Sequence, residues 1–120
     1  MITILKTDFA FSDDRGDICQ LLSFPNKQVN YLFTRKNAKR GCHYHKNNRE
    51  YFYMISGKVE LTGYDVGTHD HNETYTFEKG SFFCVEPYTV HDFRFLEDTQ
   101  MIVVYDKGVE EENGKDIYTE

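Results

Sequence analysis

Turn-forming residues recur at short intervals along the whole chain, and this spacing is the feature that most constrains the fold. Examples are the dipeptides at 25–26, 40–41, 56–57 and 79–80. The segments between such marks have the length and composition of strands and show no helical period. They are residues 18–24, 29–34, 42–45, 51–55, 58–64, 73–77, 81–85, 91–96 and 101–105. This pattern predicts a β-sandwich or barrel with no helix longer than about two turns.

Length and composition agree with this fold class. A chain of 120 residues has the size of one domain, so we expect a single domain over 1–120. Aromatic residues make up 16% of the chain, and aromatic side chains favour the half-buried surface of strands.

The net charge and the lack of long apolar runs argue against several partners and locations. The formal net charge of -6 disfavours nucleic acid or an anionic membrane as a partner, so we expect a small ligand instead. The sequence contains no apolar run that resembles a signal peptide or a membrane span, and we therefore expect a cytoplasmic protein. Its three cysteines, Cys19, Cys42 and Cys84, form no close pair, so we expect reduced and mostly buried thiols.

Strand alternation predicts which ionisable side chains meet. Residues two apart on a strand face the same way, so His43 and His45 share a face. His91 then faces inward with residues 93 and 95, while Asp92 faces outward. Glu50 likewise shares its face with residues 52 and 54. These alternations predict a polar mouth above an aromatic core.

The residue types at this mouth are those that bind divalent metal ions. Imidazole nitrogen and carboxylate oxygen suit zinc, manganese, iron or nickel. His43, His45, Glu50 and His91 are therefore the candidate ligands. A second His-x-His pair at 69–71 lies in a turn rich in Gly, Asp and Asn, where we expect a solvated hairpin tip. Cys42 and Tyr44 alternate away from the mouth, and we expect them to contribute to packing.

Two motifs in order identify a family that the chain resembles. Residues 41–57 contain His-x-His, four residues, Glu, six residues and Gly, which resembles the first cupin motif. Residues 80–91, with Pro87 four positions before His91, resemble the second. The resemblance implies an all-β cupin fold, the RmlC-like jelly-roll, which is a double-stranded β-helix barrel.

Two further segments narrow the resemblance to cupins that act on nucleotide-linked sugars. Residues 13–16 (DDRG) and 39–45 (KRGCHYH) resemble segments of sugar 3,4-ketoisomerases and of dTDP-4-dehydrorhamnose 3,5-epimerase relatives. The run from His43 to Glu50 is also similar to the cupin domain of capsular polysaccharide epimerases. The resemblance implies an isomerase or epimerase of surface polysaccharide or deoxysugar biosynthesis, which removes a proton next to the ketone of a nucleotide-linked 4-keto sugar.

The same resemblance implies roles for individual residues. A base would take the proton, and His43 or His45 is the candidate. Tyr31, Tyr53 and Tyr105 are candidates for the proton donor, and Tyr105 is also a candidate for substrate binding. Cations next to the motifs would bind the diphosphate; these are Arg15, Arg40, Lys46 and Arg49.

Three alternatives stay open at this stage. A histidine cannot be a saturated metal ligand and a free base in one step, so the chain uses either a divalent ion or metal-free histidines, and the spacing of Glu50 favours the ion. The activity could instead be that of a metal-dependent cupin such as an oxygenase, or the chain could bind a sugar or small molecule without catalysis. The resemblance also implies a homodimer, which would cover edge strands such as the one containing Ile2 and Ile4.

Overall fold

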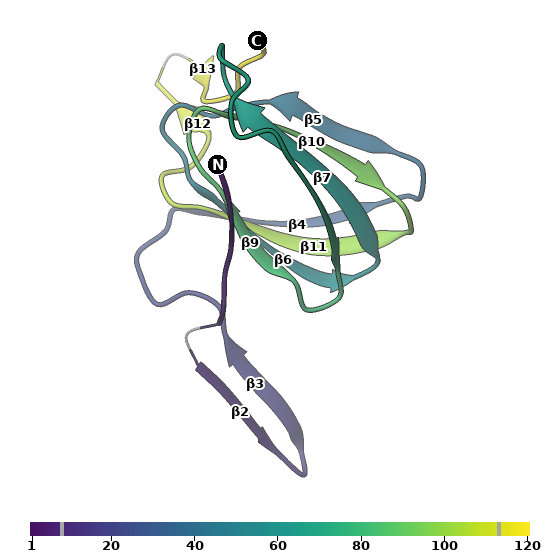
Figure 1. The fold of residues 1–120 in the computed structure, drawn as a ribbon. Coiled ribbons are helices and arrows are strands. Elements are labelled where there is room, and N and C mark those ends of the chain that lie inside the picture. Colours follow the sequence, from purple (N-terminus) through teal and green to yellow (C-terminus); the bar gives the residue numbers. More distant parts are fainter. Residues whose placement is uncertain (8, 113) are drawn as a thin grey trace.

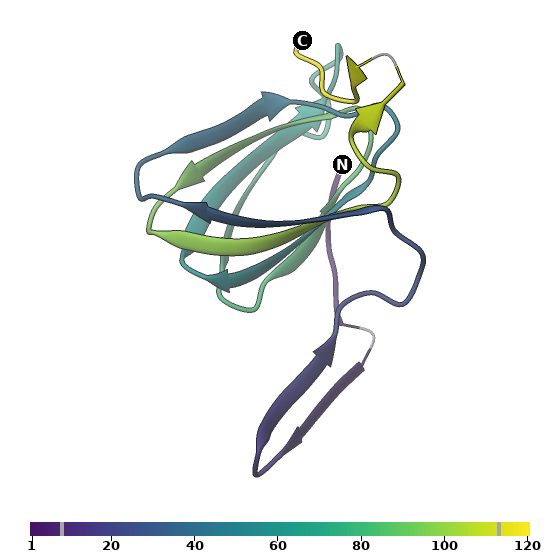
Figure 2. The ribbon, with the colours of Figure 1, turned by 180° about the vertical axis from the view of Figure 1, so that it is seen from behind.

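Antiparallel β-strands form two facing sheets in the computed structural model, which describes residues 1–7, 9–112 and 114–120. The larger sheet has the strand order β1-β9-β6-β11-β4, and the smaller has the order β5-β10-β7-β8 (Figures 1 and 2). The bounds of these strands are β1 Ile2–Ile4, β4 Gln28–Thr34, β5 Lys39–His43, β6 Glu50–Ser56, β7 Lys58–Asp65, β8 Glu73–Glu78, β9 Phe82–Val85, β10 Thr89–Phe95 and β11 Thr99–Tyr105. The described residues contain no helix, so the all-β prediction is confirmed.

An apolar core fills the space between the two sheets. Phe52 and Phe83 from the larger sheet stack with ring centroids 5.0 Å apart, and Phe77 from β8 stacks on Phe83 at 3.9 Å. Buried aliphatic and aromatic residues of β6, β7, β10 and β11 complete this core. The inward alternation predicted for β6 and β10 is confirmed, because alternate residues of both strands are buried. This core holds the two sheets together and includes residues of β6 and β10, the strands that carry Glu50 and His91.

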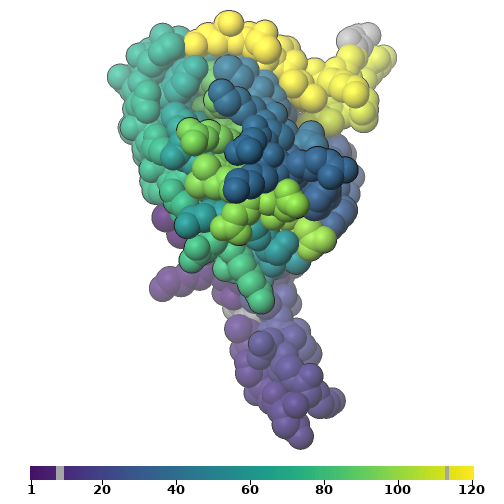
Figure 3. All heavy atoms as spheres, turned by 90° about the vertical axis from the view of Figure 1, so that its right-hand side faces the viewer, coloured from purple at the N-terminus to yellow at the C-terminus, as the bar shows by residue number. Residues whose placement is uncertain are grey.

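A two-stranded hairpin projects away from the barrel. It consists of β2 (Phe9–Asp13) and β3 (Gly16–Gln20). Figure 1 shows it extending beyond both sheets, and in the space-filling view of Figure 3 it projects from the rest of the molecule. A second small hairpin, β12 (Glu110–Glu111) with β13 (Gly114–Lys115), lies at the opposite end of the molecule. The strand predicted at 18–24 therefore begins earlier and ends earlier than expected, because its partner is β2 and the pairing stops at Gln20.

The strand predicted at 42–45 is also displaced, and β5 spans Lys39–His43 instead. Its ladder with β10 contains a bulge, in which Cys42 is the extra residue between the pairs His91–His43 and Asp92–Gly41. The strand ends before His45 because the backbone N–H groups of residues 46–48 donate to the carboxylate of Asp116 and not to a neighbouring strand.

The cysteine prediction is half right. All three thiols are free, but only Cys84 is buried, while Cys19 and Cys42 are exposed. Cys42 is exposed because it is the bulge residue and has a left-handed backbone, with φ of 59°. It therefore does not pack, contrary to the expectation, whereas Tyr44 stacks on Tyr88 with ring centroids 6.2 Å apart.

Two smaller expectations are also confirmed. Strand β1 is an edge strand of the larger sheet, as predicted for the segment containing Ile2 and Ile4. The segment 69–71 lies in the exposed connection between β7 and β8. Among the described residues, no helix is long and apolar enough to cross a membrane.

Candidate active site

Three strand ends bring the predicted ionisable residues together. His43 is the last residue of β5 and pairs directly with His91 of β10. Glu50 is the first residue of β6, and His45 lies in the connection between β5 and β6. The ring centroid of His43 lies 5.1 Å from that of His45 and 4.6 Å from that of His91. The structure therefore assembles all four residues that the motifs singled out.

Gly41 makes this approach of β5 to β10 possible. Its φ of 106° lies in the left-handed region, and a Cβ atom at this position would lie only 2.5 Å from the backbone oxygen of His91. Only glycine leaves room for the oxygen there. The bulge at Cys42 that follows places His43 opposite His91.

Glu50 contacts two of the three imidazoles. Its Oε1 atom lies 2.8 Å from Nε2 of His45 and 3.0 Å from Nε2 of His91, and all three side chains are buried. The other ring nitrogens face backbone carbonyls: Nδ1 of His45 lies 2.5 Å from the oxygen of Asp116, and Nδ1 of His91 lies 3.0 Å from that of Thr89. A carbonyl only accepts, so both Nδ1 atoms carry the proton.

These contacts shift the pKa values of the buried groups. Burial alone would raise the pKa of Glu50, but the adjacent imidazoles of His91 and His45 outweigh it and hold this pKa far below the usual range. Burial also opposes a charge on His45, yet Glu50 and Asp116 raise its pKa. Burial, and then the neighbouring His91, lower the pKa of His43 to about 4. His43 is therefore a neutral imidazole at neutral pH.

A cavity of about 340 Å³ opens beside this cluster, which is within the size range of small-molecule sites. His43, Glu50, His91 and Tyr105 form its polar part, and apolar side chains form the rest. The full lining is Leu32, Lys39, Arg40, Gly41, His43, Glu50, Phe52, His91, Phe93, Phe95, Met101, Val103 and Tyr105. His45 is not among them; its ring is buried, with Nδ1 facing the carbonyl of Asp116 and Nε2 facing Glu50.

The predicted tyrosines separate into two groups. Tyr105 lines the cavity, and burial, followed by the charge of Glu50, raises the pKa of its hydroxyl, which stays protonated. Tyr31 is 59% exposed and lies on the outer face of β4. Tyr53 alternates with the buried residues of β6 and packs against Phe82. Tyr31 and Tyr53 therefore lie outside the cavity of their own chain.

The predicted cations separate in the same way. Arg40 lines the cavity, and its Nε donates to Oγ1 of Thr34 at 2.8 Å. Arg15 lies at the tip of the β2–β3 hairpin, where it pairs with Asp13 at 2.6 Å. The structure thus places Arg40 in the cavity and Arg15 far from it.

Two other predicted cations are engaged outside the cavity. Lys46 lies over the ring of Tyr118, 4.2 Å from its centroid. Arg49 pairs with Glu86 at 2.8 Å. Lys39, which the sequence reasoning missed, does line the cavity. The available signal was its position on the strand that ends at His43.

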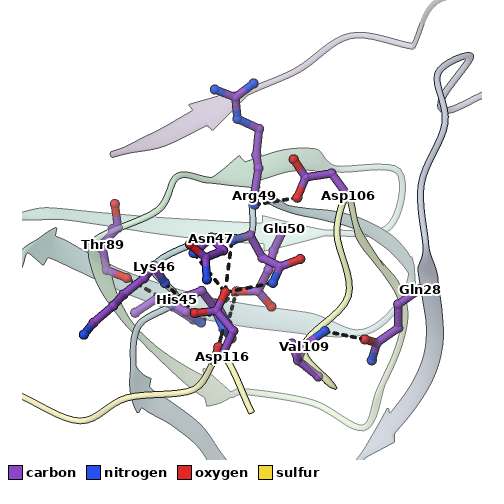
Figure 4. A network of polar contacts seen from close by, with 12 residues as sticks. Gln28, His45, Lys46, Asn47, Arg49, Glu50, Thr89, Asp106, Val109 and Asp116 are labelled. Atoms are coloured by element: carbon purple, nitrogen blue, oxygen red, sulfur yellow. Dashed lines mark hydrogen bonds and ion pairs between the residues drawn. The ribbon is translucent and has the colours of Figure 1, made fainter. Parts of the chain in front are cut away.

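The sequence reasoning also missed Asp116. This residue is fully buried, and it contacts both His45 and the connection that follows it (Figure 4). No motif indicated it, because it lies 71 positions along the chain from His45. Only the folded chain brings the two together.

The cluster also provides donors for a metal ion. The ligand atoms of His43, His45 and His91 all lie within 4.8 Å of one another. With Nδ1 of His45 and His91 donating to carbonyls, their Nε2 atoms are directed at the centre of the cluster, as in metal sites whose histidines are held by outer hydrogen bonds. Nε2 of His45 and Oε1 of Glu50 are buried and in contact, yet they do not align as a hydrogen bond. This donor set fits a divalent ion.

Comparisons with known proteins agree with the fold. No curated protein sequence matches the chain significantly. A 3,4-ketoisomerase from Helicobacter canadensis is 19% identical, with a TM-score of 0.78 over 99% of this chain and 90% of that one. The dTDP-4-dehydrorhamnose 3,5-epimerase from Sulfolobus tokodaii is 21% identical, with a TM-score of 0.74 over 94% and 74%.

A third structure contains a sugar ligand. It is a histidine-to-asparagine mutant of QdtA, a 3,4-ketoisomerase from Thermoanaerobacterium thermosaccharolyticum, in complex with TDP-4-keto-6-deoxyglucose. It is 16% identical, with a TM-score of 0.76 over 94% of this chain and 84% of that one. At these identities the likeness establishes the fold. The sequence model of the cupin domain matches residues 34–105, which contain both motifs and all four clustered residues. The chain therefore belongs to the cupin family.

Proposed function

We propose that this cupin is an isomerase or epimerase that moves a proton next to the ketone of a nucleotide-linked 4-keto sugar. The observation that carries the proposal is His43, a neutral imidazole that lines a cavity of about 340 Å³ beside a buried Glu50–imidazole cluster. Cupins of the same fold include 3,4-ketoisomerases and a 3,5-epimerase. General-base chemistry at the carbon next to a ketone requires such a group within reach of the substrate.

The charge distribution supports a nucleotide-linked substrate. The chain carries a net charge of -6, yet Lys39 and Arg40 both line the cavity. Two cations at the cavity would pair with a diphosphate, which carries charge opposite to theirs. One cupin of this fold binds TDP-4-keto-6-deoxyglucose, and a sugar of that class is the substrate that we propose here.

The proposed chemistry uses residues that face the cavity. His43 accepts the proton from the carbon next to the ketone, and the electron pair of that C–H bond forms the enolate. Return of the proton to the opposite face of the same carbon gives the epimer. Its return to the former carbonyl carbon moves the ketone, provided that the enolate oxygen gains a proton and the hydroxyl of the deprotonated carbon loses its own. Tyr105 is the hydroxyl in the cavity, and we propose it as the proton donor in place of Tyr31 and Tyr53.

A divalent ion would change the role of His43. His43, His45 and His91 would hold the ion, with Glu50 beside two of them, and the ion would polarise the sugar ketone. His43 would then be a ligand, and the proton would go to another group. The metal-free mode has the stronger support, because a single oxygen of Glu50 already contacts both buried imidazoles and leaves His43 facing the cavity.

We also propose that the chain forms a homodimer. Val29, Tyr31 and Phe33 form an exposed row on the outer face of β4, which is an edge strand of the larger sheet. The β2–β3 hairpin exposes Phe11 and Ile18, and every residue of β3 is exposed. Apolar rows of this kind mark surfaces where proteins associate.

Proton exchange in deuterated water tests the proposed activity. With TDP-4-keto-6-deoxyglucose as the probe, we expect deuterium at C3 of the sugar. We expect His43→Asn to abolish this exchange, because it removes the base. The matched control is His69→Asn, which makes the same change at an exposed residue of the β7–β8 connection and should exchange normally. Absence of exchange in the unaltered chain, or unchanged exchange in His43→Asn, would overturn the proposal.

A further inference from the structure

Asp116 is fully buried, and its carboxylate accepts four hydrogen bonds from one short segment. Oδ1 accepts from the backbone N–H of Lys46 at 2.8 Å, and Oδ2 accepts from the backbone N–H groups of Asn47 and Asn48 at 2.9 and 3.1 Å. The side-chain amide of Asn48 also donates to Oδ2 at 2.8 Å. Figure 4 shows these bonds converging on one side chain. The carboxylate therefore fixes the segment that directly follows His45.

The backbone of the same residue contacts the His45 ring. The carbonyl oxygen of Asp116 accepts from Nδ1 of His45 at 2.5 Å. With Nδ1 held in this way, the ring plane and the direction of Nε2 are set, and Nε2 meets Oε1 of Glu50 at 2.8 Å. One residue thus holds both the ring of His45 and the backbone that carries it.

Further bonds dock the segment around Asp116 onto the barrel. The backbone N–H of Asp116 donates to the carbonyl of Val109 at 2.8 Å. Tyr118 and Tyr44 exchange two backbone hydrogen bonds, of 2.9 and 3.0 Å. The amide of Asn48 also donates to the carbonyl of Gly108 at 2.8 Å. The cupin match ends at residue 105, so this docked segment lies outside the part of the chain that the family defines.

We propose that Asp116 is a positioning residue for the active site, which acts on the substrate through His45 and Glu50. This inference rests on the proposed function, and it adds that the segment beyond the family match completes the site. Asp116 does not line the cavity, so it does not contact the substrate. A purely structural role would stabilise residues 45–48 without an effect on the orientation of the His45 ring.

Nuclear magnetic resonance of the full chain separates these two roles without any substrate. A buried imidazole N–H that donates to a carbonyl exchanges slowly with water and gives a protected proton signal. We expect such signals from His45 and from His91, whose Nδ1 donates to Thr89. Asp116→Ala keeps the backbone carbonyl that faces His45 but removes the carboxylate that holds residues 46–48. If the carboxylate holds the ring against this carbonyl, we expect the His45 signal to disappear and the His91 signal, an internal reference, to remain.

Kinetics with TDP-4-keto-6-deoxyglucose give the second readout. We expect Asp116→Ala to lower kcat by about 10–100-fold, the range for loss of the groups that hold a site histidine in place, with KM unchanged. Asp116→Asn keeps the shape of the side chain and one acceptor oxygen, so we expect an intermediate loss. This variant decides the question if Asp116→Ala does not fold.

The matched control is Asp106→Asn. Asp106 accepts a backbone hydrogen bond from Arg49 at 3.0 Å, in the same connection, but it does not contact His45. We expect this variant to keep the His45 signal and kcat. A folded Asp116 variant that keeps both would overturn the positioning role. If the unaltered chain turns over no sugar, the proposed function fails, and the resonance experiment alone decides the role of Asp116.

Discussion

At the scale of single residues, one carboxylate organises the site. Glu50 enters the barrel as the first residue of β6 and contacts the buried imidazoles of His45 and His91. Removing one partner from such a buried charged contact leaves an unpaired charge, which is strongly destabilising. His43 is the imidazole left to face the cavity. The assignment of His43 as base or ligand therefore depends on whether an ion displaces these contacts.

Metal content decides between these two modes. Because Oε1 of Glu50 already contacts Nε2 of both His45 and His91, we expect less than about half an equivalent of divalent metal after purification without chelator. We also expect proton exchange to survive chelation. Elemental analysis and exchange assays before and after treatment with a chelator measure both. One equivalent of metal with activity lost on chelation would make His43 a ligand.

At the scale of elements, the connections are held by specific polar contacts. The connection between β7 and β8 carries two histidine–carboxylate pairs, Nδ1 of His71 with Asp65 and Nε2 of His69 with Glu120, each at 2.6 Å. Asp65 also lies 3.8 Å from the amino group of Met1. These exposed pairs join the ends of the chain to this connection.

The pair of His71 and Asp65 makes stability depend on pH. Its hydrogen bond to Asp65 raises the pKa of His71 above 6.5, with Asp70 and Glu73 adding to the shift, so this contribution is full below about pH 6.5 and is lost as the pH rises further. The hydrogen bond from His71 lowers the pKa of Asp65 below 3.8, so its contribution is lost in acid.

We therefore expect His71→Gln to lower Tm most at about pH 5 and to have no effect at about pH 9. Thermal unfolding at the two pH values measures this difference. Thr68→Ala is the control: it removes the Thr68 hydroxyl that accepts from the N–H of Asp70 in the same connection, but no titratable group. Its effect should be equal at both pH values. An effect of His71→Gln that is independent of pH would contradict the prediction.

At the scale of the whole molecule, the barrel leaves apolar surface uncovered. The chain extends over 50 × 32 × 24 Å because the β2–β3 hairpin projects from it (Figure 3). An isolated two-stranded hairpin is at best marginally stable in water, so a covering surface would stabilise it. The exposed row on β4 of a second copy of the chain offers a surface that could cover the hairpin.

We expect the unaltered chain to have twice the 14.2 kDa mass of one copy at micromolar concentration. Tyr31→Glu places a charge in the exposed row of β4 and should give a monomer, because burying an unpaired charge is costly. Thr76→Glu adds the same charge to an exposed position of β8 and should leave the dimer intact. Light scattering after gel filtration measures these masses. A monomeric unaltered chain would refute the homodimer.

The sequence by itself determined the fold class and four residues of the cluster. Alternation and turn spacing are local properties, so they place Glu50, His43 and His91 on strand faces without knowledge of the partners. The motif spacing then identified the cupin family, which the match over residues 34–105 confirms. Local patterns carried this information because each strand buries only one face.

Only the tertiary structure decided which of the other candidates reach the cavity. Arg40 and Tyr105 line it, whereas Arg15 lies on a projecting hairpin and Tyr31 on an outer face. Asp116 could not be predicted, because its role depends on docking a segment 71 positions away from His45. Alternation assigns a side chain to a face, but the pairing of distant segments decides what that face meets.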